Sequence, residues 1–205
     1  MNDSASWPAT FALNAHGGTQ RRNVELKARL TSIDAARRTA ENLCTDCLGI
    51  QRQVDTYFFC RRGRLKLRQI EPREAQLVWY ARPDDSGPKM SNYRLVPVSD
   101  TPQLRQALAE ALGVQSVVRK RREIFLFQNV RIHLDEVCDL GRFLEFEAVL
   151  GPDADEASGR TQLAMLSERF DISASDLLTN SYGDMLERRT KPHTRPELRP
   201  RADPG

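Results

Sequence analysis

Charged and apolar residues alternate along three consecutive strand-like runs between Val118 and Leu150. Side chains two residues apart on a strand point to the same side of the sheet. The runs therefore contain three same-face groups: Lys120 with Arg122; Arg131 with His133 and Asp135; and Glu145 with Glu147. Strong bases beside paired carboxylates on one surface are typical of a site for a metal ion that carries a polyanion.

Two earlier runs show the same alternation. Residues 22–30 place Glu25 and Lys27 on one face, with apolar residues on the other. The run that begins at Gly63 places three bases on one face, about 6.6 Å apart at each step: Arg64, Lys66 and Arg68. Like charges at this spacing repel one another. A solvated surface tolerates them, whereas an enclosed surface holds them only with a polyanionic ligand.

The remaining sequence supplies the elements that position these residues. Turn, cap and periodicity signals predict five strands before the three runs, over 22–30, 53–60, 63–70, 76–82 and 89–98. They also predict helices over 34–45, 102–112, 155–169 and 176–186. The Leu104 and Leu108 stripe of the second helix is expected to contact the core. These elements indicate an α+β protein with a large antiparallel sheet, and eight strands suffice to close a barrel.

A barrel closed with its charged faces inward would have a highly charged lumen. Each uncompensated buried charge is costly, so such a lumen needs water, internal pairing, a metal and an anionic ligand. Carboxylate oxygens suit Mg²⁺ or Mn²⁺ better than zinc. Many cations beside a divalent metal indicate a polyphosphate ligand. The bases of this lumen are Lys27, Arg64, Lys66, Arg68, Lys89, Lys120, Arg122 and Arg131, and its acids are Glu25, Asp135, Glu145 and Glu147.

The overall composition fits one cytoplasmic domain with tails. We expect a disordered leader over 1–20, the domain over 21–186 and a disordered Pro- and Arg-rich tail over 187–205. No apolar run approaches the about 20 residues of a membrane span. We expect no signal peptide, because the N-terminal residues lack a basic region followed by an apolar core. The net charge of +3 does not by itself indicate nucleic acid.

The cysteines and histidines favour no other catalytic chemistry. The four cysteines are expected to be free thiols in a reducing compartment. Cys44 and Cys47 form a lone C-x-x-C at the predicted end of a helix, without the second pair that a zinc site needs. Among the three histidines only His133 lies on a predicted strand, so a Ser-His or Cys-His nucleophile has little support.

Seven short motifs together resemble the CYTH superfamily of triphosphate tunnel enzymes, over residues 22–186. The last two motifs are most similar to its class IV adenylate cyclase branch. The motifs are N-V-E-L-K (23–27), Q-x-D-T-Y-F (53–58), G-R-L-K-L-R (63–68), G-P-K-x-S-x-Y (87–93), K-R-R (120–122), R-I-H-L-D (131–135) and L-G-x-F-L-E-F-E (140–147).

The resemblance implies an eight-stranded antiparallel barrel, the triphosphate tunnel, with flanking helices. It implies metal-binding acids at Glu25, Asp135, Glu145 and Glu147. It implies phosphate-binding bases at Arg64, Lys66, Arg68 and Lys89, to which the charge pattern adds Arg131. Lys27, Lys120 and Arg122 become candidate catalytic residues, whose positive charges would offset negative charge in the transition state. Asn23 stands where the family signature E-x-E-x-K has its first acid. This leaves open whether the protein binds one metal ion or two.

The function implied by the resemblance is a metal-dependent reaction of a triphosphate. One outcome is an adenylate cyclase that converts ATP to cyclic AMP and pyrophosphate; the other is a triphosphatase acting on inorganic or organic triphosphates. A non-catalytic polyphosphate- or nucleotide-binding module stays open. RNA binding through Arg61, Arg62 and the tail is disfavoured, because few aromatic stacking platforms accompany the bases. No membrane partner is expected, and a homodimer is compatible with the sequence.

Overall fold

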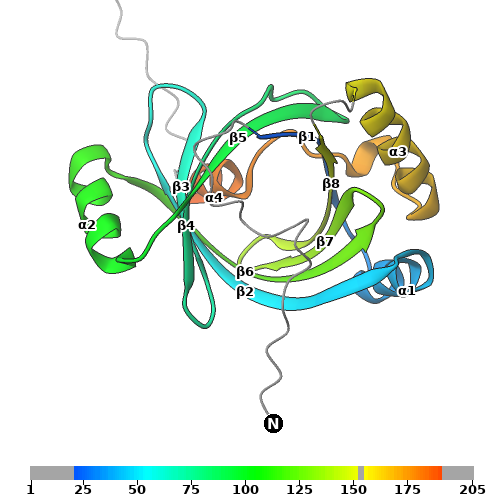
Figure 1. The fold of residues 1–205 in the computed structure, drawn as a ribbon, viewed down its shortest axis with the longest axis horizontal. Coiled ribbons are helices and arrows are strands. Elements are labelled where there is room, and N and C mark those ends of the chain that lie inside the picture. The colour runs from blue at the N-terminus through cyan, green and yellow to red at the C-terminus, as the bar shows by residue number, and fades with distance from the viewer. Residues whose placement is uncertain (1–20, 152–154, 191–205) are drawn as a thin grey trace, which may run out of the picture.

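Eight strands form a closed antiparallel barrel in the computed structural model, which describes residues 21–151 and 155–190 (Figure 1). Around the barrel the strands follow the order β1-β5-β4-β3-β2-β6-β7-β8, and β8 closes against β1. The predicted barrel is confirmed. The strands are β1 (Arg21–Arg29), β2 (Asp46–Phe58), β3 (Arg64–Ile70), β4 (Glu74–Ala81), β5 (Lys89–Pro97), β6 (Val114–Phe127), β7 (Val130–Val137) and β8 (Gly141–Leu150).

Four α-helices and one short 3₁₀ helix accompany the barrel in the described part of the chain. They are α1 (Ile33–Leu43), α2 (Thr101–Leu112), α3 (Glu156–Arg169), η1 (Ala174–Asp176) and α4 (Tyr182–Thr190). Polar side chains cap three of them, because each accepts a bond from a backbone N–H that has no partner within the helix. The caps are Ser32 on α1, Asp100 on α2 and Asp155 on α3.

The register of the barrel brings distant acids and bases together. Directly paired residues on neighbouring strands face the same side of the sheet. Pairing of β1 with β8 therefore places Glu25 beside Glu147 and Lys27 beside Glu145. Pairing of β7 with β8 places Arg131 beside Glu147. Closure of the barrel, and not proximity in the sequence, assembles these groups.

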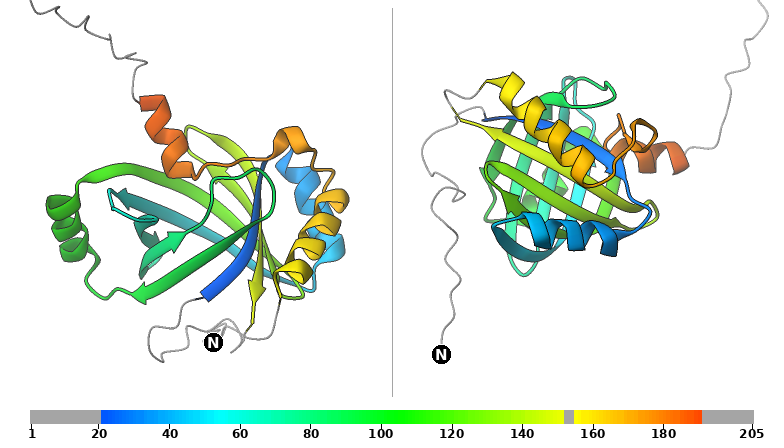
Figure 2. Two further views of the ribbon diagram at one scale, coloured as in Figure 1. Left: turned by 90° about the horizontal axis from the view of Figure 1, so that it is seen from above. Right: turned by 90° about the vertical axis from the view of Figure 1, so that its right-hand side faces the viewer.

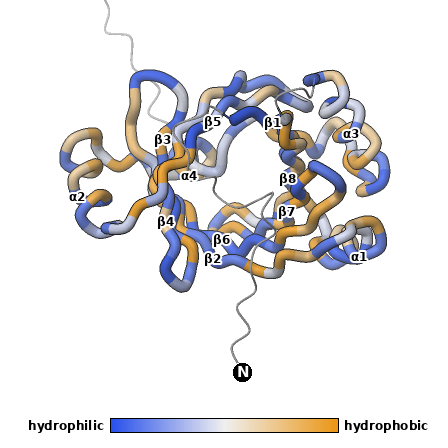
Figure 3. The backbone as a smooth tube through the Cα atoms, viewed as in Figure 1, coloured by the Kyte–Doolittle hydropathy of each residue, from blue (hydrophilic) through white to orange (hydrophobic). Residues whose placement is uncertain are grey.

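The main hydrophobic core lies outside the barrel. The outward faces of β1, β7 and β8 pack against α1 and α3, which lie on the same side of the molecule (Figure 1). Leu163 and Leu166 of α3 and Ile132 and Leu134 of β7 are fully buried there. Figure 3 shows hydrophobic and hydrophilic residues alternating along the barrel strands. The alternation gives one face to this core and leaves the other face for a polar lumen.

Helix α4 lies at one end of the barrel (Figure 2). The segment before it crosses the barrel end, where the Leu178 N–H donates to the Lys27 carbonyl at 2.8 Å. Tyr182, the first residue of α4, is 2% exposed and its ring contacts that of Phe143 at a centroid distance of 5.0 Å. This contact holds α4 against the mouth of the lumen.

Three element predictions are corrected by the structure. The second strand begins at Asp46 and not at residue 53, so Cys47 lies in β2 and only Cys44 caps α1. Helix α2 buries none of its residues, and its leucine stripe is therefore not a core contact. In Figure 1, α2 projects from the side of the barrel opposite α1 and α3.

The C-terminal helix also differs from its prediction. A capping box formed by Ser173 and Asp176 caps the N-terminus of the short helix η1, and α4 begins only at Tyr182. Helix α4 then continues to Thr190, into the predicted tail. The predicted leader (1–20) and the rest of the tail (191–205) lie outside the described residues. No helix in the described part of the chain is long and apolar enough to cross a membrane.

The external core predicts which helix stabilises the barrel. Replacement of the fully buried Leu163 on α3 by alanine should lower the free energy of unfolding by about 2–5 kcal/mol, because it leaves a cavity against the barrel. Urea unfolding followed by circular dichroism measures the change.

The matched control is Leu112→Ala on α2, whose side chain is 38% exposed. This control should change the free energy of unfolding by no more than about 0.5 kcal/mol. Equal losses in the two variants would contradict the assignment of the core to the α3 side of the barrel.

Candidate functional site

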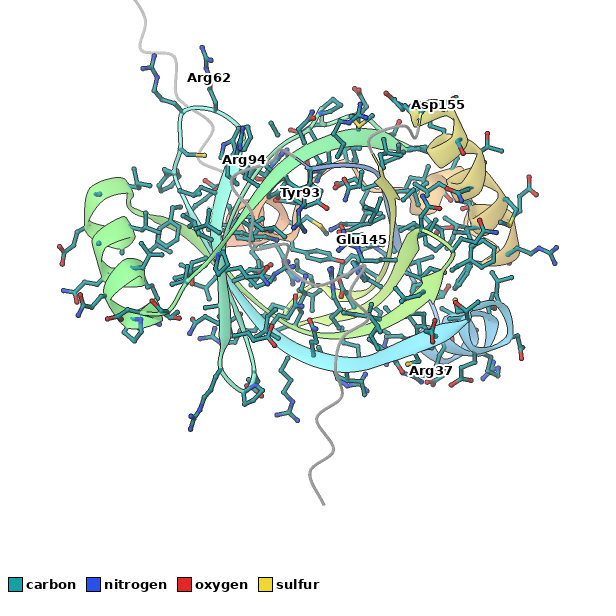
Figure 4. The ribbon with its side chains drawn as sticks, in the orientation of Figure 1. Arg37, Arg62, Tyr93, Arg94, Glu145 and Asp155 are labelled. Atoms are coloured by element: carbon teal, nitrogen blue, oxygen red, sulfur yellow. The ribbon has the colours of Figure 1, made fainter. Side chains whose placement is uncertain are left out.

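The lumen of the barrel contains a cavity of about 160 Å³. This is many times the about 10–15 Å³ that a single water needs. Its wall is mostly polar and comes from strands all around the barrel. Figure 4 shows Glu145 and Tyr93 inside the ring of strands, whereas Arg37, Arg62 and Asp155 lie on the outside. The predicted site residues that line the cavity are Glu25, Lys27, Lys66, Arg68, Lys120, Arg122, Arg131, Glu145 and Glu147.

Asp55 on β2 holds the bases on one wall of the lumen. Its two carboxylate oxygens accept bonds of 2.8 and 2.9 Å from Arg68 and of 2.9 Å from Lys66. The Lys120 amine lies 3.9 Å away. Burial alone would raise the pKa of Asp55, but Arg68 and Lys66 outweigh burial and hold the pKa well below its ordinary value. Asp55 is 1% exposed and therefore supplies the buried counter-charge for these cations.

A second buried group surrounds Arg122 on β6. Arg122 binds Asp135 through two bonds of 2.7 and 2.6 Å and donates a third, of 2.6 Å, to Glu145. The Tyr182 hydroxyl donates to Asp135 at 2.8 Å. Asp135, for which the resemblance implied a metal-binding role, is fully buried and does not line the cavity. In this structure its carboxylate positions Arg122 and connects the lumen to α4.

Three carboxylates face the cavity from adjacent strands. Glu145 accepts from Lys27 at 3.0 Å, Glu147 pairs with Arg131 at 2.9 Å, and Glu25 pairs with Arg82 at 2.9 Å. Burial raises the pKa of Glu25, and the negative charges of Glu145 and Glu147 raise it further against the opposing effect of Arg82. Bringing carboxylates this close is costly unless cations lie between them. The cluster therefore has the charge of a cation site.

Two further polar atoms beside these acids have no hydrogen-bond partner among the described residues: the Asn23 side-chain oxygen and His133 Nδ1. Both residues are 3% exposed. Asn23 lines the cavity, and one ligand atom each from His133, Glu145 and Glu147 lie within 4.8 Å of one another. Unsatisfied buried polar atoms beside carboxylates fit the ligand set of a divalent cation.

Two predicted phosphate-binding bases have other partners. Arg64 pairs with Asp84 and Asp184, each at 2.8 Å. The Lys89 amine donates to the backbone carbonyls of Asp85 at 2.9 Å and of Leu178 and Thr179 at 3.2 Å. Neither residue is among those that line the cavity. The structure thus places both next to the α4 segment at the barrel end and apart from the other bases.

Several lumen residues were not predicted from the sequence. Asp55, Arg82, Tyr80 and Tyr182 all contact a predicted site residue or line the cavity. Asp55 shares a strand face with Gln53 and Tyr57 in the run 53–58, so the period-two pattern could have indicated that Asp55 is a polar residue of the lumen. Tyr182 lies outside the barrel strands, and no strand pattern indicates its position.

A closed antiparallel barrel with acids and bases in its lumen is the triphosphate tunnel fold, and sequence comparison gives the family. The CYTH domain family model matches residues 21–182, so the chain belongs to the CYTH domain family. No protein with curated annotation matches the sequence at a significant level.

Solved structures share the fold at low sequence identity. The PH1012 protein of Pyrococcus horikoshii OT3 is similar with a TM-score of 0.70 and 23% identity, over 79% of this chain and 98% of that one. A candidate adenylate cyclase from Vibrio parahaemolyticus gives 0.65 and 20%, over 83% and 99%. A candidate adenylyl cyclase from Hippeastrum, described as having a dominant triphosphatase activity, gives 0.56 and 16%, over 82% and 96%.

The Asp55 cluster predicts a large effect on stability. The Asp55→Asn variant should lose about 3–5 kcal/mol of unfolding free energy, because Lys66 and Arg68 would remain buried without their counter-charge. Urea unfolding at neutral pH measures the loss.

The matched control is Asp34→Asn on the surface. Asp34 is 72% exposed and pairs with Arg37, and exposed pairs of this kind contribute about 0.2–1 kcal/mol. A loss in Asp55→Asn no larger than in the control would show that water already compensates the lumen bases.

The buried lysine predicts a pH dependence of anion binding. Burial, together with the positive charge of Arg68, lowers the pKa of Lys66 to about 8 against the opposing effect of Asp55. An anion binds the protonated amine more strongly, so the Kd for tripolyphosphate should rise above about pH 8, by up to about tenfold per pH unit. Calorimetric titration across this range measures it.

Lys66→Arg is the control for this pH effect, because a guanidinium keeps its charge throughout the range. The arginine variant should show a flatter profile, which also separates the effect from ionisation of the ligand itself. Identical profiles for the two proteins would exclude Lys66 as the titrating group.

Proposed function

We propose that the protein is a divalent-metal-dependent enzyme that acts on a triphosphate inside the barrel, in the manner of class IV adenylate cyclases or of triphosphatases. One observation carries the proposal. Bases from β3, β6 and β7 and carboxylates from β1 and β8 line one cavity. A polyphosphate with a bound cation matches this arrangement, because its oxygens can contact the bases while its cation contacts the acids.

The lumen charges are paired with each other. Lys27 with Glu145 and Arg131 with Glu147 are such pairs. A polyphosphate that carries a cation offers each partner a replacement, since the bases can bind phosphate oxygens and the acids can bind the cation. Exchange of one pairing for another avoids leaving buried charges uncompensated. Binding of phosphate and metal is therefore expected to be mutually dependent.

In the proposed reaction Mg²⁺ or Mn²⁺ would supply electrostatic stabilisation of the phosphate oxygens. Glu25, Glu145 and Glu147 would hold it, and Asp135 would orient Arg122. Lys66, Arg68 and Arg131 would bind the phosphates. Lys27, Lys120 and Arg122 would offset the negative charge that develops on the transferring group. Arg64 and Lys89 would contact the substrate only if the α4 segment yields its bonds to them.

Two reactions fit this machinery. In a cyclase, the ribose 3′-hydroxyl attacks the α-phosphorus and pyrophosphate leaves. In a triphosphatase, water attacks the terminal phosphorus, the remaining diphosphate leaves, and the attacked group is released as orthophosphate. The deciding factor is which phosphorus lies in line with the nucleophile. The Vibrio parahaemolyticus protein is named as a candidate adenylate cyclase, and the Hippeastrum protein is described as having a dominant triphosphatase activity. Both outcomes therefore enter the test.

Phosphorus NMR of the purified protein distinguishes these reactions. The protein is incubated separately with ATP and with tripolyphosphate, each with Mg²⁺ and then with Mn²⁺. Cyclic AMP with pyrophosphate identifies a cyclase, and orthophosphate identifies a triphosphatase. Shifted ligand resonances without any product would instead support a non-catalytic binding module.

The proposed metal ligands predict the effect of one substitution. Glu147→Gln should abolish metal-dependent turnover, because it removes one charge from the cation site while keeping the size of the side chain. The side chains of Glu147 and its partner Arg131 are 18% and 25% exposed, so water can solvate the arginine that loses its partner and the thermal unfolding temperature should change little. Turnover equal to that of the unchanged protein would contradict the metal assignment.

We also propose that residues 21–186 act as one catalytic unit in the cytoplasm. The four cysteines are free thiols in the structure, which fits a reducing compartment. A limited proteolysis experiment that leaves this unit intact and active would support the proposed boundaries. Loss of activity on trimming at residue 187 would assign α4 a larger role, since this helix runs to Thr190.

A further inference from the structure

His133 is a buried polar residue that the proposed reaction does not use. It lies on β7, paired with Glu145 of β8 and Ile124 of β6. Its side chain is 4% exposed. Its Nδ1 atom has no hydrogen-bond partner among the described residues. Buried polar atoms nearly always have a hydrogen-bond partner. A buried imidazole nitrogen without one, beside a charged lumen, therefore indicates that a ligand binds there.

The distances around His133 Nδ1 are those of a shared cation site. The atom lies 3.7 Å from Glu145 Oε2 and 3.9 Å from Glu147 Oε1. Both distances exceed the range of a hydrogen bond. Two donors that each bind the same transition-metal ion at about 2.1 Å are separated by roughly 3–4 Å. The ligand atoms of His133, Glu145 and Glu147 lie within 4.8 Å of one another, so small side-chain shifts would let one cation contact all three.

The neighbouring bases do not prevent this arrangement when substrate is bound. Arg131 pairs with the second oxygen of Glu147, Oε2, which leaves Oε1 free to face His133. Arg122 binds Glu145 Oε2, the oxygen nearest to His133. A carboxylate oxygen has two lone pairs and can accept from Arg122 while it contacts a cation. The positive charges nearby also favour entry of the cation together with a polyphosphate.

We propose that His133 Nδ1 is a ligand of the catalytic cation together with Glu145 and Glu147, and that this nitrogen makes the site select Mn²⁺ over Mg²⁺. The inference rests on the proposed metal dependence. An all-oxygen ligand set suits Mg²⁺ and Mn²⁺ alike, whereas an added imidazole nitrogen strengthens binding of first-row transition metals, Mn²⁺ included, more than binding of Mg²⁺. Co²⁺ should therefore also bind this site more tightly than Mg²⁺ does.

Pulsed EPR of the wild-type protein with MnCl₂ and tripolyphosphate tests the ligand directly. Coordination by His133 should produce a nitrogen coupling that changes when the protein is prepared with ¹⁵N-labelled histidine. His133 is the one histidine in the described residues, and the Glu147→Gln variant serves as a control that should lose the bound ion. A Mn²⁺ signal without any histidine nitrogen coupling would overturn the inference.

The His133→Asn variant tests selectivity by calorimetry, because asparagine places an amide near the position of Nδ1. The affinity for Mn²⁺ and Co²⁺ should fall by about tenfold or more, while the affinity for Mg²⁺ should change much less. An unchanged ratio of Mn²⁺ to Mg²⁺ affinity would also overturn the inference. If the variant does not fold, the EPR measurement on the wild-type protein decides alone.

The two proposals fail in different ways. Turnover of tripolyphosphate by His133→Asn with unchanged metal preference would refute the histidine ligand and retain the enzyme. Absence of product from the wild-type protein with every metal would refute the proposed function, whatever the EPR spectrum shows.

Discussion

The acids and bases buried inside the barrel must be paired with one another for its wall to fold. Asp55 and Asp135 are 1% and 0% exposed; Asp55 accepts short bonds from Lys66 and Arg68, and Asp135 accepts two from Arg122. Without these carboxylates the lysines and arginines of the lumen could not be buried, since an isolated buried charge costs several kcal/mol. The remaining acids, Glu25, Glu145 and Glu147, face the cavity. The lumen thus has structural acids behind the bases and exchangeable acids in front of them.

A lumen of this kind requires the hydrophobic core to be elsewhere. The core lies on the outer face of β1, β7 and β8, where α1 and α3 cover it. Period-two alternation makes this division simple, because each strand gives one face to the core and the other to the cavity. The barrel wall is therefore stabilised from outside, and the inner face is left for binding. Helix α2 takes no part in this core, which agrees with its lack of buried residues.

The C-terminal segment, from Leu178 to helix α4, contacts the charged residues of the lumen. Tyr182 of α4 donates to Asp135, and its ring lies 3.6 Å from the Lys27 amine. The preceding residues, Leu178 and Thr179, accept bonds from Lys89. These contacts connect the C-terminal segment to Lys27 of β1 and to Lys89 of β5. Through Asp135 they also connect it to Arg122 of β6. Family membership and fold define the type of tunnel.

Alternation of charged and apolar residues is visible in the amino-acid sequence, and it predicted the barrel class and most of the lumen. Glu25, Lys27, Lys66, Arg68, Lys120, Arg122, Arg131, Glu145 and Glu147 were predicted from strand spacing and motif resemblance, and all line one cavity. The sequence pattern did not separate them from Arg64 and Lys89, which share their faces but contact the α4 segment. It also missed the roles of Asp55, Arg82 and Tyr182. Spacing along one strand states which side a residue faces, whereas its partner depends on register and closure between strands far apart in the chain. Only the tertiary structure decides those pairings, because they form where β1 meets β8 and where α4 meets the barrel end.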